Sequence, residues 1–415
     1  MILAALLLPL LLAQATASAP GPPKAGWSAE DRTKVVELFR KMDEAQEKGK
    51  GEREAKESLG KALEAIGKKL KADPLSFAGD LQKVLEAVPD YRSHASHPAI
   101  GKESVVDPKS GFKFVLRLPR GYDAKRPWPV LLVIPPAGEK PDAYLRSAWK
   151  EEGLHATTIL AAPEMPAKVS EWRTLEGGVT AAMRTFGEVL SQFNVDRDRV
   201  VLAGGKEGGA FAMTLVSYYP DRFAGAVSRL GGGEGAAFAN LGNVPTYFSG
   251  SAESLKKVSD AAKELRRDNV TIAEADDLAA VVNWIGERVR NPVPTEVAFS
   301  PVQAFTRNAY WFKIENFEIL PDYFAAPVNE RPLISARLLR GTNTVEFEAR
   351  GITDFWLFLS DSLLDLDKPI KVVVNGKAWE GSYKRELDKF LASRRQRFDP
   401  RLTCVAWHVS AVPKG

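Results

Sequence analysis

The hydrophobic and polar positions in the first part of the chain repeat at helical spacing. After Ser28 and Asp31, which resemble a helix capping box, one helix face carries Val35, Leu38, Phe39 and Met42. Beyond the break KGKG at 48–51, leucine and isoleucine recur at positions 59, 63, 66 and 70, and a third amphipathic segment runs from 77 to 88. We therefore expect a helical region over 27–92 whose charged faces lie in solvent.

The pattern changes to period two at Phe112, and the alternation that follows it predicts a half-buried strand. Apolar runs typical of buried strands then come at 130–134, 157–163 and 200–202, and the segments 223–230, 244–250 and 270–275 also read as strands. Helical segments are expected between these runs, at about 176–192, from the glycine-rich turn to Tyr219, at 254–267 and at 278–290. Buried strands that alternate with helices indicate a mostly parallel sheet covered on both faces, here within 93–292.

After Asn291-Pro292 the helical pattern largely stops and period-two segments alternate with turn clusters. This pattern predicts a β-rich C-terminal domain over 296–415, a small sandwich with one helical stretch at 383–395. Its aromatic side chains are placed at strand spacing, which favours core positions over the alternative of a sugar-binding platform; they are Tyr310, Trp311, Phe312, Phe355, Trp356, Phe358 and Trp379.

Composition adds limits on function. A chain of 415 residues is too long for one ordinary domain, and 45% hydrophobic with 27% charged residues is the profile of a soluble globular protein. A net charge of +4 gives no support to nucleic-acid binding, which needs a concentrated basic face. The single cysteine, Cys404, excludes an intramolecular disulfide.

The first residues predict the compartment. Residues 1–19 combine an apolar run of about a dozen residues with small residues in A-x-A spacing, which is the pattern of a signal peptide. Cleavage is expected after Ala15, Ala17 or Ala19, and 20–26 reads as a short linker. Other apolar stretches fall short of 18 residues, so we expect no transmembrane segment in the mature chain and a periplasmic, cell-surface or secreted location.

The stretch 198–212, DRVVLAGGKEGGAFA, carries the strongest local signal. An apolar run meets a glycine-dense turn, and a helix of small residues begins at once. A strand driven this tightly into a helix presents one side chain above its sheet, with helix N–H groups directed to the same place. Here that side chain is Lys206.

Taken in order, the motifs of 112–292 resemble those of the α/β-hydrolase superfamily, in its secreted esterase and prolyl-oligopeptidase-like type. The phrases that carry the resemblance are LPRGYDAKRPWPVLLVI, AAPE, the elbow with its helix and the next strand, VPTYFSGSAE and WIGERVRNP. The β-rich tail resembles the C-terminal appendage of such proteins. The resemblance implies a hydrolase-like sheet with a nucleophile after strand 5, an acid after strand 7 and a histidine after strand 8.

The catalytic residues that the resemblance implies do not match. Lys206 stands at the nucleophile position, while Glu253 matches the acid position. The loop after strand 8 reads Ala-Asp-Asp-Leu at 275–278 and has no imidazole. The four histidines, at 94, 97, 155 and 408, are poor substitutes by their place in the chain. Pro136 stands in the oxyanion segment, and a proline has no N–H to donate.

The leading interpretation is therefore an exported α/β-hydrolase-fold pseudoenzyme that binds an unknown small ligand or a protein partner. We expect its ligand site in the former active-site cleft, at Gly205, Lys206, Glu207, Trp172 and Glu253, with Lys206 and Glu253 joined as an ion pair. We expect no cofactor and no metal, since His, Cys and carboxylate spacing lacks a ligand pattern. Two alternatives stay open: an active esterase or peptidase with an unidentified nucleophile, and polymer or cell-surface binding through the C-terminal β domain.

Overall fold

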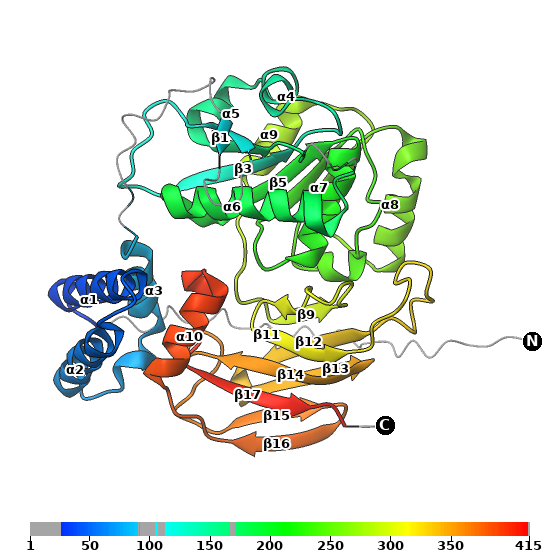
Figure 1. The fold of residues 1–415 in the computed structure, drawn as a ribbon. Helices are drawn as coiled ribbons and strands as arrows, with labels where there is room; N and C mark the ends of the chain where they lie inside the picture. Colours follow the sequence, from blue (N-terminus) through cyan, green and yellow to red (C-terminus); the bar gives the residue numbers. More distant parts are fainter. Residues whose placement is uncertain are drawn as a thin grey trace, which may run out of the picture.

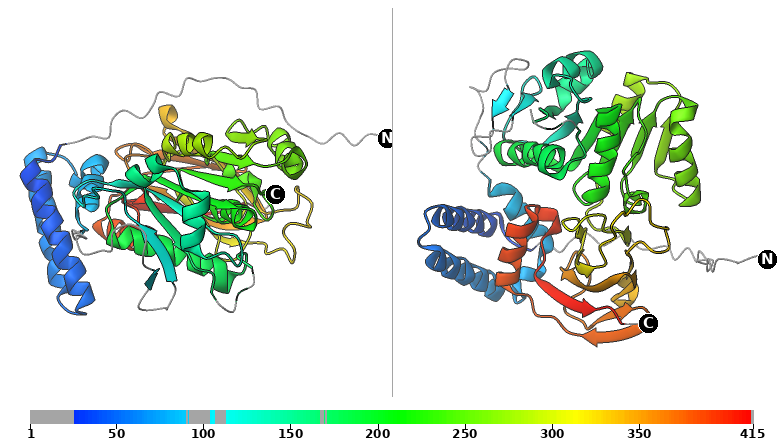
Figure 2. Two further views of the ribbon diagram at one scale, coloured as in Figure 1. Left: turned by 90° about the horizontal axis from the view of Figure 1, so that it is seen from above. Right: turned by 45° about the vertical axis from the view of Figure 1, so that its right-hand side comes forward.

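The computed structural model describes residues 26–89, 91, 104–106, 113–166, 169 and 171–413. The predicted signal peptide 1–19, most of the linker 20–26, Phe112, His94 and His97 lie outside these residues. Among the helices of the described ranges, none combines the length and the apolar character that a bilayer crossing requires. Figures 1 and 2 show the chain as an upper layered α/β part, a lower β-rich part and a helical part beside them.

Residues 26–89 form the helical region that the sequence predicts. Its helices are α1 (Ala29–Glu47), α2 (Glu52–Leu70) and α3 (Ala78–Ala87), with the short 3-10 turn η1 (Pro74–Ser76) before α3. The capping box at the start of α1 is confirmed, because the Ser28 hydroxyl accepts from the Asp31 amide and Asp31 accepts from the Ser28 amide. Helices α1 and α2 run side by side as a hairpin (Figure 2).

The central part of the described chain is built on an eight-stranded sheet in the order β1-β2-β4-β3-β5-β6-β7-β8. Its strands are β1 (Ser104–Val106), β2 (Lys113–Arg117), β3 (Trp128–Ile134), β4 (Ile159–Pro163), β5 (Val195–Gly205), β6 (Gly225–Arg229), β7 (Thr246–Ser249) and β8 (Val270–Ala273). Strands β3 to β8 pair in parallel, whereas β2 pairs antiparallel with β1 and β4. The mostly parallel sheet is confirmed.

Helices cover both faces of this sheet. They are α4 (Pro141–Ala148), α5 (Glu152–Thr157), α6 (Thr180–Gln192) with the π-helical turn η2 (Leu175–Val179), α7 (Glu207–Tyr218), α8 (Ala252–Glu264) and α9 (Leu278–Gly286). Two apolar clusters separate on the two faces, one with α6 and α7 and the other with α4 and α9. The sequence pattern did not predict α4 and α5, whose short apolar repeats lie between stronger strand signals.

This architecture is the α/β-hydrolase fold that the resemblance implied. The tight strand–helix turn follows β5, the predicted acid position follows β7, and the loop expected to hold a histidine follows β8. Parallel strands bring the ends of β5, β7 and β8 to one edge of the sheet.

The C-terminal part is a β sandwich, as predicted. One sheet has the order β10-β11-β14-β17 and the other β16-β15-β13-β12-β9. Their strands are β9 (Glu296–Phe299), β10 (Asn308–Ala309), β11 (Phe312–Phe317), β12 (Leu333–Leu339), β13 (Thr344–Arg350), β14 (Ile352–Leu359), β15 (Ile370–Val374), β16 (Lys377–Gly381) and β17 (Ala406–Ala411). The predicted helical stretch is α10 (Leu387–Arg397). Of the aromatics expected in its core, Trp356 is half-buried and Trp379 is 45% exposed, whereas the other five are buried.

The helical region packs against the C-terminal sandwich. One continuous apolar cluster contains residues of α1, α2 and α3 together with both sheets of the sandwich. Phe39 meets Phe390 of α10 edge to face, with ring centroids 6.2 Å apart, and Arg394 contacts both carboxylate oxygens of Asp43. Figure 1 shows α10 lying between the blue helices and the sheets. The two ends of the described chain thus share one core.

Candidate functional site

The turn between β5 and α7 has the geometry of a nucleophile elbow. Strand β5 ends at Gly205, α7 begins at Glu207, and Lys206 between them has φ 50° and ψ −124°. The Lys206 amide donates to the Arg229 carbonyl at 2.8 Å, which ties the turn to β6. A side-chain-bearing residue in this region costs about 1–3 kcal/mol and persists only where its surroundings enforce it.

Close packing enforces the turn. A Cβ at Gly208 would overlap the Ile134 carbonyl oxygen, and one at Gly205 would overlap the Tyr144 hydroxyl. The small residues at the start of α7 therefore let the helix cross close to β3 and β5. These glycines serve the backbone geometry and do not by themselves indicate catalysis.

Lys206 stands at a cleft of about 750 Å³ above the sheet edge. The cleft is lined by Ala137, Glu171, Trp172, Arg173, Lys206, Glu207, Ala210, Leu230, Gly231, Gly232, Glu234 and Ser254. Lys206 and Glu207 are exposed, and within the described residues no carboxylate forms an ion pair with Lys206. Leu230, beside them, is 53% exposed and also has a positive φ, of 53°.

The structure places Glu253 apart from the cleft lining. It lies exposed in the first turn of α8, whose cap is the Ser251 hydroxyl, and the neighbouring Ser254 lines the cleft instead. The expected ion pair between Lys206 and Glu253 is not among the contacts of the described residues. The first turn of α8 turns the Glu253 side chain to solvent.

The predicted oxyanion segment is occupied by a structural contact. Pro135 and Pro136 are buried after β3, and the indole nitrogen of Trp172 donates to the Pro135 carbonyl at 2.7 Å. Trp172 is 3% exposed and its ring stacks on Phe211 at 5.8 Å. Trp172 therefore lines the cleft but is held by its own packing and hydrogen bond.

An ion pair between the buried Arg229 and the partly buried Asp276 occupies the place where the resemblance expects the histidine. Asp276 follows β8, and both of its carboxylate oxygens accept from Arg229, at 2.8 and 2.7 Å. The Ser249 hydroxyl at the end of β7 donates to the same carboxylate at 2.9 Å. Arg229 also donates to the Ala148 carbonyl and lies 5.0 Å from the Trp149 ring.

The charge state of this pair follows from its contacts. Burial alone would raise the pKa of Asp276, but hydrogen bonds and charge from Arg229, with the Ser249 hydroxyl, hold that pKa below its usual range. The carboxylate is therefore ionised at neutral pH and is engaged by both Arg229 and Ser249. It cannot orient an imidazole at Lys206.

Sequence reasoning missed Arg229 and Asp276. The signal was present, because Arg229 ends a buried apolar strand, where a charge needs a partner. Asp276 stands beside Asp277, which caps α9 by accepting from the amides of residues 279 and 280. Because Asp277 serves as the helix cap, Asp276 was available to pair with Arg229.

Other candidate groups lack a catalytic arrangement. Ser254 is the hydroxyl residue that lines the cleft, and its hydroxyl donates to the Ser251 carbonyl at 2.8 Å. His155 lies 2.7 Å from the Trp149 carbonyl oxygen and His408 stacks on Trp379, both outside the cleft lining. In the part of the chain that the structure describes, no three His, Cys or acidic side chains converge as metal ligands would.

No family model matches the chain, and no curated protein matches it in sequence. Among solved structures, it is similar to a thermostable esterase, with 18% identity and a TM-score of 0.38 over 45% of this chain and 62% of that chain. It is also similar to S-formylglutathione hydrolase from Staphylococcus aureus, with 13% identity and a TM-score of 0.36 over 44% of this chain and 96% of that one.

A ferulic acid esterase from Anaeromyces mucronatus is similar at 13% identity, with a TM-score of 0.36 over 48% of this chain and 94% of that one. This chain spans less than two thirds of the thermostable esterase that it matches. Such distant and partial similarities carry no argument about activity. The fold assignment rests on the strand order and on the place of the elbow.

Proposed function

Since the central domain has the α/β-hydrolase fold, we propose that this protein is a non-catalytic member of that architecture and binds a small ligand in the cleft at Lys206. The proposal rests mainly on one observation: Arg229 and Asp276 form a bidentate ion pair at the position where a catalytic histidine would be expected. Acyl transfer needs a nucleophile, a base and an oxyanion hole together. Losing all three removes most of the rate acceleration.

Three departures support the absence of turnover. Lys206 replaces a hydroxyl nucleophile, the described cleft lining contains no imidazole, and Pro136 cannot donate to an oxyanion. A lysine nucleophile would need a lowered pKa, which requires a desolvated side chain. Lys206 is exposed, so its side chain is not desolvated.

The cleft itself supports a binding role. It is of the size of ordinary ligand sites and combines cations, acids and the exposed apolar Leu230 at one edge. Both Lys206 and Leu230 keep side chains in backbone conformations that favour glycine. Strain retained at two neighbouring cleft residues favours a use for those side chains.

Covalent labelling tests the absence of a nucleophile. We expect a fluorophosphonate probe to leave the protein unlabelled by intact-mass measurement, with an active serine esterase as positive control. Ligand-observed NMR with a fragment mixture should detect binders that lose their signal in Lys206→Ala. Labelling of any serine would contradict the absence of a nucleophile. Binders whose affinity is unchanged in Lys206→Ala and Leu230→Gly would contradict a ligand site in this cleft.

An active hydrolase remains the second candidate because Ser254 presents a hydroxyl at the cleft. Its hydroxyl contacts Ser251, and a base for it is not found among the described neighbours. Fluorophosphonate labelling that disappears in Ser254→Ala and persists in Ser251→Ala would favour this candidate over ours.

Binding of a polymer through the C-terminal sandwich is the third candidate. Trp379 at the edge strand β16 is 45% exposed and stacks on His408, with ring centroids 4.7 Å apart. Co-sedimentation of the full chain with insoluble cellulose, chitin or peptidoglycan would support it if Trp379→Ala abolished the association and Phe324→Ala, another exposed aromatic, did not.

We further propose that the protein is exported, on the strength of the signal-peptide pattern in 1–19. Expression with the intact N-terminus should yield a mature chain that begins after Ala15, Ala17 or Ala19. Mass spectrometry of the purified protein measures this directly, and a chain that keeps residues 1–19 would contradict export by cleavage.

A further inference from the structure

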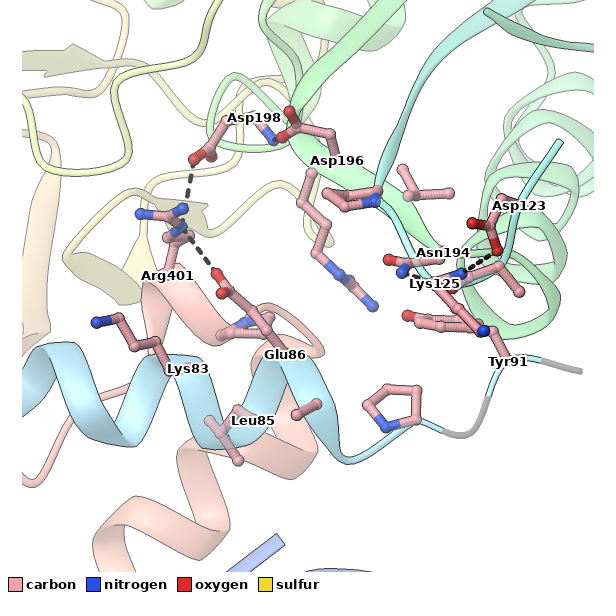
Figure 3. A pocket seen from close by; sticks show the side chains of 17 residues that line it. Lys83, Leu85, Glu86, Tyr91, Asp123, Lys125, Asn194, Asp196, Asp198 and Arg401 are labelled. Carbon is pink, nitrogen blue, oxygen red and sulfur yellow. Dashed lines mark hydrogen bonds and ion pairs between the residues drawn. The ribbon is translucent and has the colours of Figure 1, made fainter. Parts of the chain in front are cut away.

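A second and larger cavity lies at the opposite end of β5. It has a volume of about 880 Å³ and is lined by Lys83, Leu85, Glu86, Ala87, Pro89, Tyr91, Asp123, Ala124, Lys125, Pro127, Asn194, Val195, Asp196, Arg197, Asp198, Pro400 and Arg401. Its walls come from α3, the loop before β3, the start of β5 and the turn η5 (Pro400–Leu402) (Figure 3). We call this cavity the junction cleft, because all three parts of the chain meet there.

Ion pairs across the parts of the chain hold these walls in place. Arg401 of η5 lies 3.2 Å from Glu86 of α3 and 3.3 Å from Asp198 of β5, and Figure 3 shows it between them. Arg290, which is buried behind the cleft, donates to Asp198 at 2.8 Å. The cleft is therefore pre-formed, which lowers the entropic cost of binding.

The carboxylates of the junction cleft already have partners. Glu86 and Asp198 are in the ion pairs just described, while Asp123 accepts from the Lys125 amide and Asp196 from the Asp198 amide. These last two carboxylates are thereby held in turns of the backbone, facing N–H groups.

Several basic side chains of the junction cleft have no carboxylate partner among the described residues. Lys83 and Lys125 are exposed, and neither has a carboxylate within ion-pair distance among the described residues. Arg197 donates to the Phe398 carbonyl and likewise contacts no described carboxylate. Four basic and four acidic side chains line the cleft, and among the basic ones Lys83 and Lys125 lie on two walls with no described carboxylate in ion-pair contact. Figure 3 shows Lys83 on α3 and Lys125 across the cavity from it.

From this arrangement we propose that the junction cleft binds a small molecule with at least two anionic groups, carboxylate or phosphate, which Lys83 and Lys125 engage from opposite walls. Asn194 and Tyr91 add polar groups at the cavity, and the buried Leu85 and Val195 supply an apolar surface for the body of the ligand. The site is independent of the Lys206 cleft, which lies at the other end of β5.

Isothermal titration of the full chain at constant ionic strength tests this inference. Citrate represents polycarboxylates and inorganic pyrophosphate represents phosphates, so the two arms distinguish the chemical source. We expect saturable one-to-one binding of one probe, weakened about tenfold or more in Lys83→Gln/Lys125→Gln because two charge contacts are lost. The matched control is Lys41→Gln/Lys257→Gln, which removes two exposed lysines outside the cleft.

The control variant and Lys206→Ala should each bind the probe as the wild type does. Equal weakening in both double variants would overturn the proposal, because it would indicate diffuse attraction to surface charge. Absence of saturable binding by either probe at millimolar concentration would overturn it as well. Circular dichroism and urea unfolding of the variants establish that lost binding does not come from lost folding.

Discussion

At the scale of single residues, Lys206 is the most informative position. Its backbone keeps the conformation of a nucleophile elbow, while its side chain extends into solvent at the cleft. The conformation is strained for lysine and is enforced by hydrogen bonding to Arg229 and by close packing at Gly205 and Gly208. Under the function that we propose, the position keeps the architecture of the elbow without its hydroxyl nucleophile.

Replacing Lys206 by glycine should stabilise the fold. We expect Lys206→Gly to raise the free energy of unfolding by about 1 kcal/mol, because glycine adopts φ 50° without steric cost. Lys206→Ala keeps a Cβ and should change stability little. Urea unfolding of the three proteins measures the difference, and a glycine variant less stable than the alanine variant would contradict the strain argument.

Asp276 should stabilise the fold in a pH-dependent way. We expect Asp276→Asn to cost about 3 kcal/mol at pH 7, since it leaves the buried Arg229 without its counter-charge. The folded-state pKa of Asp276 is lowered, so its contribution is complete above the unfolded carboxyl pKa of about 3.9 and is lost as the pH falls through the lower folded value.

The stability gap between wild type and Asp276→Asn should therefore be constant from pH 7 to about pH 5 and narrow below about pH 4. Asp260→Asn, in an exposed pair with Lys256, is the control and should leave stability nearly unchanged. A gap that widened on acidification would contradict an ionised Asp276 in the folded state.

At the scale of elements, the crossing of β5 and α7 depends on glycines that a side chain would displace. Gly208 approaches the end of β3, whereas Gly187 of α6 has open space around its Cα. We expect Gly208→Ala to cost about 2 kcal/mol or more through overlap with the Ile134 carbonyl. Gly187→Ala should instead gain about 0.5–1 kcal/mol from helix propensity.

Thermal unfolding of the two variants measures this contrast. Equal effects of both substitutions on stability would contradict this expectation. They would mean that the turn at Gly208 accommodates a Cβ without loss of stability.

The sequence predicted some helices and strands well and missed others. Apolar runs identified β3 to β7, because both faces of these strands are largely buried, whereas the edge strand β8 is partly exposed. The short α4 and α5 were missed since their burial depends on Trp149 and on contacts that periodicity does not encode. The elbow was predictable from local glycines, but the partner of Arg229 came from a loop 47 residues away.

At the scale of the whole molecule, buried charges join the α/β part to the sandwich. Arg290 contacts Asp198 and Asp399, and Arg397 of α10 contacts Asp221. Burial alone would raise the pKa of Asp399, but Arg290 holds that pKa far below its usual range. Such buried pairs add little to the net free energy of unfolding, but removing one partner destabilises the fold strongly. They therefore fix one arrangement of the domains.

Domain coupling can be measured by unfolding. We expect the full chain to lose both parts in one transition in urea, and Arg290→Met to cost about 3–5 kcal/mol by leaving two carboxylates without this partner. Separate transitions in the variant, read by tryptophan fluorescence and circular dichroism, would confirm that the network couples the domains. Separate transitions in the wild type would contradict it.

The sequence did not encode this arrangement in any local pattern. It predicted a helical region, an α/β domain and a sandwich in order, yet the first packs on the last through Phe39, Phe390 and Asp43. Pairings between residues 351 positions apart arise from the closed fold, and periodicity reports only on local structure.

Steady-state hydrolysis of p-nitrophenyl acetate and butyrate by the purified full chain tests directly whether the protein lacks esterase activity. We predict rates equal to the buffer background for the wild type, Lys206→Ala and Ser254→Ala alike. Turnover above background that either substitution abolishes, while Lys257→Ala retains it, would contradict the claim that this hydrolase fold has no hydrolase chemistry.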